Sequence, residues 1–176
     1  MDTHRKTVNP QSGFTLIELI VVLVLIGILS ALALSRFFSF QQEARIAKTQ
    51  AIYGAVREAA NLASSVCITD IAGLNPTPPA PVCANAAVGN TVVMSGTAVS
   101  MTFLYPTATL AGIIASTQLV PFVSTSNPGD NISVTTAGST LTINTLGGTV
   151  GSCSVTYTAP TAINTSPGYG INTSAC

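Results

Sequence analysis

The chain has 176 residues, of which 47% are hydrophobic and only 7% are charged, and its formal net charge is zero. This balance gives no long-range attraction to nucleic acid or anionic lipid, which excludes a protein that binds through a basic surface. After Glu58 only Asp70 and Asp130 are charged, and the only histidine is His4. A nucleophile, a base and an orienting group cannot be assembled from these residues, so we expect no enzymatic activity and no cofactor.

The N-terminal third combines a short basic segment with a long apolar run. Residues 1–13 contain Arg5 and Lys6 but no apolar run, and we expect them to be a leader rather than part of the fold. The next segment, residues 14–34, contains a single charge, Glu18. As a helix this segment would be about 31 Å long, which matches the roughly 30 Å hydrocarbon core of a bilayer. The sequence therefore predicts a transmembrane helix with one carboxylate near its start.

That carboxylate needs a partner, because a charged group inside lipid costs about 2.5–3.5 kcal/mol on insertion scales. If the chain were cut after Gly13, Phe14 would carry a new α-amino group and Glu18 would lie in the first turn of the new helix. The positive end of the helix dipole favours a carboxylate at this position. The carboxylate could also pair with the amine of a neighbouring copy.

The stretch 13–19, with the sequence GFTLIEL, lies behind a short basic leader and opens the apolar run. This pattern resembles the prepilin processing signal of type IV pilins and pseudopilins. The resemblance implies that a prepilin peptidase cuts between Gly13 and Phe14 and methylates the Phe14 amine. It also implies that Glu18 acts with Phe14 in assembly. A second similarity, over residues 96–113, is to the mannose-sensitive haemagglutinin pilins and favours a type IVa-like subfamily.

The resemblance implies a structural subunit held in the bacterial inner membrane by a single span, with its C-terminus in the periplasm. The subunit would then polymerise into a helical surface filament, a type IV pilus that serves adhesion, surface attachment or motility. Its expected partners are other copies of the chain, the prepilin peptidase, and an assembly platform with its ATPase, and no nucleic acid is expected. A type II secretion pseudopilin or a minor pilin would share the same N-terminal signal, so both roles stay open.

An ordinary signal peptide is the rival interpretation of the N-terminus. Residues 31–33 read Ala-Leu-Ala, which is a possible signal peptidase site after an apolar core. Cleavage there would leave a secreted soluble binding domain without the helix. Glu18, however, interrupts the apolar core, and the helical pattern continues past the supposed cut. We therefore favour the prepilin interpretation.

The apolar helix is expected to continue beyond the membrane. No proline and only two glycines interrupt residues 14–67, so we predict one long helix, whose part over residues 35–67 is amphipathic. Two apolar stripes follow helical spacing there, and one face is expected to cover the globular part while the other is left for neighbouring copies. The first stripe contains Phe37, Phe40, Ala44, Ala47, Ala51, Ala55, Ala59, Leu62 and Val66, and the second contains Ile46, Tyr53, Val56 and Ala60.

The charged residues of this helix form no opposite-sign pair at a spacing of three or four residues. Arg45 and Lys48 place like charges three residues apart. We therefore consider two interpretations, in which these side chains either find partners on adjacent subunits or are simply solvated. The chain also lacks the proline that many type IV pilins have near the position of Leu34, so the resemblance does not extend to a kink there.

The four cysteines are Cys67, Cys83, Cys153 and Cys176, and none belongs to a Cys-x-x-Cys pair. Together with the single histidine in the leader, this argues against zinc, and no metal site is expected. An even number of cysteines on an exported chain favours disulfides. Three pairings are possible, and we favour Cys67–Cys83 and Cys153–Cys176 because each pair is nearest in sequence. Each bridge would contribute roughly 3 kcal/mol by closing a loop of about 15–25 residues.

The globular part, residues 68–176, is expected to be an α+β domain in which antiparallel strands pack on the C-terminal half of the helix. This is the pilin fold that the resemblance implies. The pattern predicts, in order, a proline-rich loop, a hairpin, a short helix, a second hairpin and a further strand over residues 70–82, 91–94 with 98–103, 108–119, 132–136 with 141–145, and 152–158. The tail, residues 159–176, reads as a loop, which a Cys153–Cys176 bridge would pin. It resembles the disulfide-bounded C-terminal region of type IV pilins.

Overall fold

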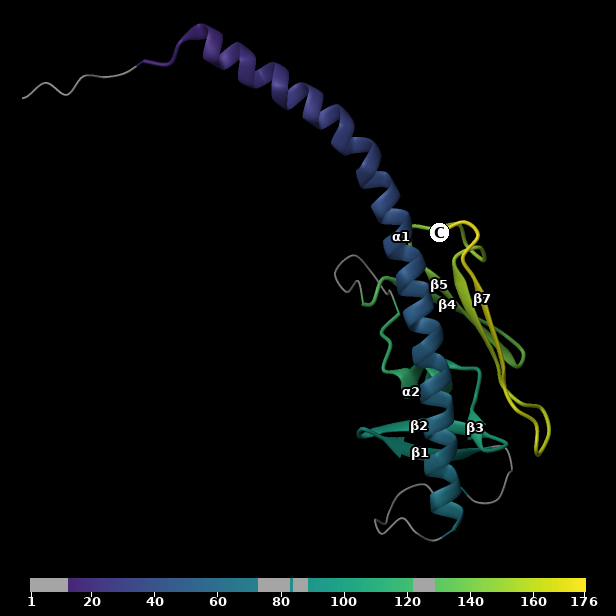
Figure 1. The fold of residues 1–176 in the computed structure, drawn as a ribbon. Helices are drawn as coiled ribbons and strands as arrows, with labels where there is room; N and C mark the ends of the chain where they lie inside the picture. Colours follow the sequence, from purple (N-terminus) through teal and green to yellow (C-terminus); the bar gives the residue numbers. More distant parts are fainter. Residues whose placement is uncertain (1–12, 73–82, 84–88, 122–128) are drawn as a thin grey trace, which may run out of the picture. The chain divides into compact units, whose positions relative to one another are not determined.

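The computed structural model describes residues 13–72, 83, 89–121 and 129–176. These fall into two units, residues 1–41 and 42–176, called here the N-terminal and C-terminal units. One helix, α1 (Leu16–Ile71), supplies residues to both units (Figure 1). The predicted long helix is confirmed, and it continues four residues beyond its expected end. The predicted loop therefore begins after Ile71, and most of it lies outside the described residues.

The N-terminal unit consists of the first part of α1 and the residues before it. The segment Leu16–Leu34 has a mean hydropathy of 2.9, and none of it is buried. Its length and composition are sufficient for a membrane span. This segment therefore depends on surroundings other than its own chain to cover its apolar side chains.

The C-terminal unit contains two antiparallel sheets, each with its strands in chain order (Figure 1). The first sheet consists of β1 (Asn90–Met94), β2 (Thr97–Thr102) and β3 (Tyr105–Pro106). Between the sheets lie a π-helical turn, η1 (Leu110–Ile114), and one turn of helix, α2 (Ala115–Thr117). The second sheet consists of β4 (Ile132–Ala137), β5 (Thr140–Thr145), β6 (Ser154–Thr158) and β7 (Gly168–Asn172). This is the expected α+β architecture.

Both predicted hairpins are present, with tighter turns than expected. Thr97 pairs with Met94, so the first turn consists of Ser95 and Gly96 alone. Both residues have positive φ angles, of 48° and 80°, which is the pattern of a type I′ turn. Ala137 likewise pairs with Thr140 and shortens the second turn to two residues. Such two-residue turns match the twist of the strands that they join.

The expectation that residues 159–176 form only a loop is wrong, because β7 pairs along β6 from Thr158 to Ser154. The glycines of β7 and the proline before it suggested a loop. Gly170 is required by packing, since a Cβ there would lie 2.4 Å from Thr156 Oγ1. The predicted helix at 108–119 is also shorter than expected, because Gly112 adopts φ −98° and ψ −105° inside η1.

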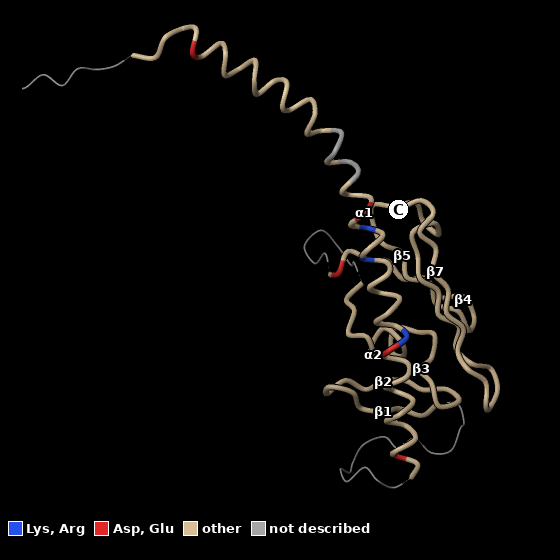
Figure 2. The backbone as a smooth tube through the Cα atoms, in the orientation of Figure 1, with Lys and Arg blue, Asp and Glu red and all other residues tan. Residues whose placement is uncertain are grey.

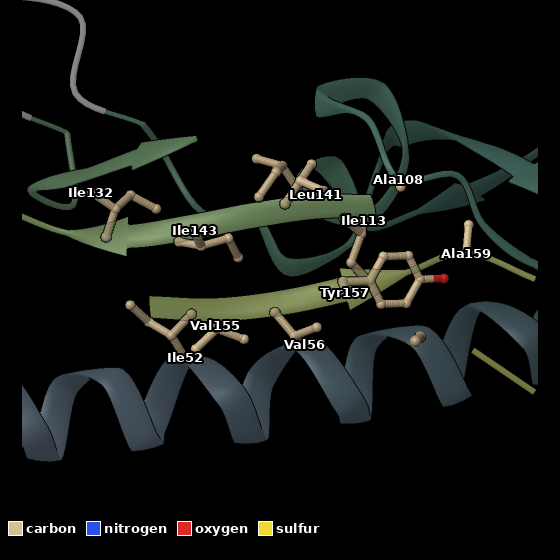
Figure 3. Close-up of a cluster of buried hydrophobic side chains, with 12 residues drawn as sticks. Ile52, Val56, Ala108, Ile113, Ile132, Leu141, Ile143, Val155, Tyr157 and Ala159 are labelled. Atoms are coloured by element: carbon tan, nitrogen blue, oxygen red, sulfur yellow. The ribbon is translucent and has the colours of Figure 1, made fainter. Parts of the chain in front are cut away.

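The core forms where the second stripe of α1 meets the second sheet (Figure 3). Val56 and Ala60 are fully buried, and they pack with side chains from β5 and β6 that include Ile143 and Tyr157. A second cluster joins Ala63 and the Cys67–Cys83 bridge to β1 and β2, through Val92, Val99 and Met101. The second stripe is therefore the face of α1 that covers the sheets.

The first stripe lies mostly on the opposite, exposed side of α1. In the C-terminal unit its exposed members are Ala44, Ala47, Ala51, Ala55 and Leu62. Only Ala59 is buried and Val66 half-buried, at the border with the core. The expectation that one face of the helix covers the globular part is thus confirmed. It leaves an exposed row of small apolar residues on the other side.

Candidate functional site

The segment that carries the expected processing and assembly residues precedes and opens α1. Gly13, Phe14 and Thr15 are exposed, and Phe14 reaches an exposed fraction of 85%. A Cβ built on Gly13 meets no atom of the described residues within 4 Å. The described part of the chain therefore leaves the peptide bond between Gly13 and Phe14 uncovered.

Glu18 lies in the first turn of α1, where the structure also reveals a helix cap. The Glu18 backbone N–H donates to the Thr15 side-chain oxygen at 3.3 Å and to the Thr15 carbonyl at 3.2 Å. Thr15 is therefore the N-cap residue and Glu18 the third residue of the helix. The spacing Thr-x-x-Glu matches the capping-box pattern, and the dipole favours the carboxylate here. Sequence reasoning missed the role of Thr15, although this spacing signals it.

The apolar residues that follow Glu18 are all exposed from Leu19 to Leu34. Soluble monomeric proteins rarely expose a continuous apolar patch larger than about 600 Å². A surface of this kind requires lipid or other protein to cover it. Glu18 is the only charged residue within this described run, so it is the one side chain whose burial would need compensation.

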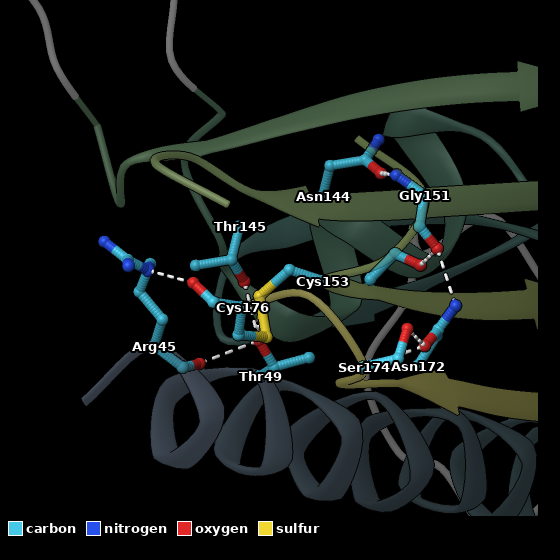
Figure 4. The surroundings of a disulfide bond; sticks show 10 residues. Arg45, Thr49, Asn144, Thr145, Gly151, Cys153, Asn172, Ser174 and Cys176 are labelled. Atoms are coloured by element: carbon cyan, nitrogen blue, oxygen red, sulfur yellow. Dashed lines mark hydrogen bonds between the residues drawn. A yellow bond between two sulfur atoms is a disulfide. The ribbon is translucent and has the colours of Figure 1, made fainter. Parts of the chain in front are cut away.

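A second site of interest lies where the C-terminal end of the chain meets α1 (Figure 4). A disulfide joins Cys153 to Cys176, with their Cα atoms 4.8 Å apart. The Arg45 Nε–H donates to the Cys176 carbonyl oxygen. The structure joins the other pair too, Cys67 to Cys83, with a Cα separation of 5.2 Å. Both bridges link the pairs that are nearest in sequence, and each one ties a later segment to α1 or its neighbourhood.

Thr49 connects α1 to this bridge, and sequence reasoning missed it. The Thr49 side chain is fully buried, and its hydroxyl lies 2.8 Å from the Arg45 carbonyl and 2.9 Å from the Thr145 hydroxyl. Since a hydroxyl has one proton and the carbonyl can only accept, Thr49 donates to Arg45 and accepts from Thr145. The Cys153 sulfur lies 3.3 Å away. One polar side chain thus ties α1, β5 and the disulfide together.

The described Lys and Arg residues all lie on α1 (Figure 2). Lys48 Nζ donates to the Asp130 carbonyl oxygen, so Lys48, like Arg45, has an acceptor in its own chain. Partners on adjacent subunits for the charged residues of α1 stay a prediction. The Asp130 carboxylate accepts from the Val120 N–H at 2.7 Å. Among the described residues no three His, Cys, Asp or Glu side chains are grouped to hold a metal ion.

Arg57 joins α1 to the edge of the second sheet through aromatic rings. Its guanidinium lies 5.7 Å from the centroid of Tyr53 and 5.8 Å from that of Tyr169. Tyr169 in turn lies 5.7 Å from Tyr157 between centroids. Burial, and then the nearby Tyr105, raise the pKa of Tyr169 to about 12, although Arg57 opposes this shift. Burial also raises the pKa of Tyr157, whose hydroxyl donates to a backbone carbonyl at 2.7 Å.

Comparison with known proteins identifies the N-terminal segment. Residues 8–34 match the family model of the prokaryotic N-terminal methylation motif. Over 52 residues the chain is 48% identical to PilA5, the major component of the type IV narrow pilus of Thermus thermophilus. That match covers 30% of this chain and 45% of the relative, so the chain spans less than half the length of the curated relative it matches. No solved structure matches the chain significantly.

The family match covers only the N-terminal part of the chain, and the structure describes the part beyond it. The methylation motif contains the exposed Gly13–Phe14 bond and Glu18 in the first turn of α1. The apolar helix fits a membrane anchor before assembly. The part beyond it is a helix packed on antiparallel sheets, an architecture like that of pilins. The pilin family is structural rather than enzymatic. In its methylation motif and the helix that follows, the N-terminal part of this chain is similar to that of type IV pilins.

Proposed function

We propose that this chain is the subunit of a type IV pilus, a surface filament for attachment or motility. The observation that carries the proposal is the continuous, fully exposed apolar run of α1 behind a methylation motif. Such a surface is stable in a bilayer before assembly, and it is equally well covered by the same helices of other copies afterwards. The subunit would wait in the inner membrane with its C-terminal unit in the periplasm.

Processing at the Gly13–Phe14 bond prepares the subunit for assembly. The exposed segment before α1 is accessible to a prepilin peptidase, which would remove residues 1–13 and methylate the Phe14 amine. Cleavage places that amine one residue before the Thr15 cap and close to the first turn, which holds Glu18. A neighbouring copy would bring its own Phe14 amine to Glu18. The pair would lower the cost of burying the carboxylate and set the axial register of the filament.

The exposed row of small residues on α1 supports lateral packing of copies. Ala44, Ala47, Ala51 and Ala55 lie on the side that the sheets leave uncovered. Small side chains allow the backbones of two helices to approach closely, which increases van der Waals contact. An assembly platform and its ATPase would supply the work of moving the helix out of the membrane. The four disulfide cysteines would brace the part of the subunit that the filament exposes.

The mature N-terminus tests processing directly, by mass spectrometry of protein sheared from cells. We expect a chain that starts at N-methyl-Phe14. A start near Leu34 would instead identify a secreted soluble domain with a conventional signal peptide. Gly13→Val should block cleavage by altering recognition by the peptidase. A side chain at this position meets no described atom within 4 Å, so the substitution should leave the described structure unchanged. Processing of this variant at the normal rate would contradict the assigned role of Gly13.

Assembly is tested by sedimentation of sheared filaments. Glu18→Ala should abolish or strongly reduce sedimentable protein while leaving processing intact. Glu18→Asp, which keeps a carboxylate at the same position, is the matched control and should retain more assembly than Glu18→Ala. Equal assembly of both variants would refute the role of Glu18. Processed subunits that form only short structures confined to the cell envelope would favour a type II secretion pseudopilin.

A further inference from the structure

Arg57 and Glu58 are consecutive residues of α1 that carry opposite charges, and both side chains are exposed. Successive residues of an α-helix are rotated by about 100° around its axis, so side chains that are neighbours in sequence do not face each other. Within the described residues, the Glu58 carboxylate accepts no hydrogen bond and joins no ion pair. A single subunit therefore leaves this carboxylate to the solvent.

The Arg57 guanidinium is held in place by two aromatic rings. It lies 5.7 Å from the ring centroid of Tyr53 on α1 and 5.8 Å from that of Tyr169 on β7. Arg45 and Lys48, in contrast, each donate to a carbonyl group of their own chain. A guanidinium that lies against rings keeps the N–H donors in its plane for another partner. The ring contacts also reduce the side-chain freedom that an ion pair with Arg57 would otherwise lose.

The two charges lie on different faces of the subunit. Glu58 falls within the exposed row of α1, three residues after Ala55 and four before Leu62, on the side that the sheets leave uncovered. Arg57 lies at the border where α1 meets β7. The subunit thus presents a negative charge on one face and a positive charge on another. Two different, complementary faces on one subunit form a heterologous contact, which generates an open helical filament when the rotation between copies does not close.

We propose that Arg57 of one copy forms an ion pair with Glu58 of the neighbouring copy in the filament. This contact rests on the proposed assembly function and adds a second charged contact between subunits. Copies in a helical filament are related by one rise, so the shift that brings the Phe14 amine of one copy to Glu18 of its neighbour applies to every residue. Phe14 and Glu18 are four residues apart, which corresponds to about 6 Å along a helix.

The same shift brings the two charges of the proposed pair close together. Arg57 of the shifted copy would lie about 4.5 Å along the axis from Glu58 of its neighbour, because Glu58 is one residue further along the helix. Side chains on a helix lean towards its N-terminus, and the long arginine side chain then points towards this carboxylate. A planar guanidinium can hold a carboxylate through two N–H donors. Glu43, the other exposed acid of α1 in the C-terminal unit, lies about four turns before Glu58 and outside this reach.

The test exchanges the charges in the full chain and measures sheared filaments by sedimentation. Cells that produce only Arg57→Glu or only Glu58→Arg present like charges at this contact, so sedimentable subunit should fall at least about tenfold. The double variant restores opposite charges. Production of both single variants in one cell restores them too, because each contact between unlike copies then joins opposite charges. Glu43→Arg is the matched control, since it reverses an exposed acid of the same helix outside the contact.

We expect filaments from the double variant and from the mixture, and Glu43→Arg should assemble like the unaltered chain. Mass spectrometry checks that every variant is processed, and near-UV circular dichroism of the extracted subunits checks that they are folded. Full assembly of both single variants, or failure of either the double variant or the mixture, would overturn the proposal. Equal losses from Glu43→Arg and Glu58→Arg would also overturn it. If the unaltered chain forms no filaments, the proposed function fails, and this contact fails with it.

Discussion

Replacing Thr49 by valine tests how α1 is joined to the disulfide and to β5. Valine has nearly the same shape as threonine, so the change removes a hydroxyl and leaves the packing in place. The hydroxyl is fully buried, and it links the Arg45 carbonyl at 2.8 Å to the Thr145 hydroxyl at 2.9 Å. Thr145 is only 4% exposed, and its hydroxyl would be left buried without its partner.

The expected change in the free energy of unfolding depends on which of the two hydroxyls is removed. Thr49→Val should lower the free energy of unfolding by about 1–3 kcal/mol, because it leaves a buried donor unsatisfied. Thr145→Val should cost less, about 0.5–1.5 kcal/mol, since the Thr49 hydroxyl keeps its bond to the Arg45 carbonyl. In the double variant neither hydroxyl is left alone. Its cost should therefore be smaller than the sum of the single costs by about 0.5–2 kcal/mol.

The assay is urea unfolding of the purified chain in detergent, followed by tyrosine near-UV circular dichroism. Thr69→Val is the matched control, because Thr69 lies on the same helix with an exposed hydroxyl bonded only to the Val66 carbonyl. This control should change the free energy by no more than about 0.5 kcal/mol. Strictly additive costs for Thr49→Val and Thr145→Val would refute the reasoning, because they would mean that the two hydroxyls do not interact.

Four further predictions concern the C-terminal unit, and the same unfolding assay measures them. Gly112→Ala should destabilise the C-terminal unit by about 1–3 kcal/mol, since the new Cβ would lie 2.2 Å from the Thr107 carbonyl oxygen. Gly54→Ala should stabilise the unit by about 0.5–1 kcal/mol, because Gly54 has a helical backbone and a Cβ there meets no atom within 4 Å. Arg57→Met should cost about 0.5–1 kcal/mol, through loss of its contacts with two aromatic rings; no change would show that these contacts are not stabilising. Stability should be constant up to about pH 10 and fall towards pH 12, because the unfolded chain ionises tyrosine near pH 10 while folding raises the pKa of Tyr169 to about 12. A flat profile across this range would contradict the burial of the tyrosines.

The features that could be predicted from the sequence are those that depend on local patterns of residues. The apolar run, the helical period and the two hairpins each depend on neighbours a few residues apart, and all of them are present in the structure. The division between the two faces of α1 could also be anticipated, because Val56 and Ala60 follow the same period as Tyr53. Such patterns can be recognised from the sequence alone, because the residues that form them are neighbours both in sequence and in space.

The missed features depend on contacts between distant residues. Strand β7 reads as a loop because its glycines weaken a strand on their own, and only the approach of Thr156 explains why Gly170 is needed. Thr49 reads as an ordinary polar residue of a helix until β5 and the disulfide are placed beside it. The two-residue turn of Phe103 and Leu104 has no turn signal at all. Both residues have positive φ angles, which large side chains rarely adopt, so no local rule predicts the turn.

The distribution of charge connects the fold to the proposed function. A helix face left in water is normally lined with charged residues, whereas the exposed face of α1 presents Ala44, Ala47, Ala51 and Ala55. The two basic residues closest to this row, Arg45 and Lys48, direct their donors to carbonyl groups of their own chain instead. They hold the C-terminal segment and the loop before β4 against the helix. The chain therefore uses two of its few charges to brace one subunit and leaves a row of small apolar side chains exposed for contact with another, an arrangement that suits a filament of identical helices.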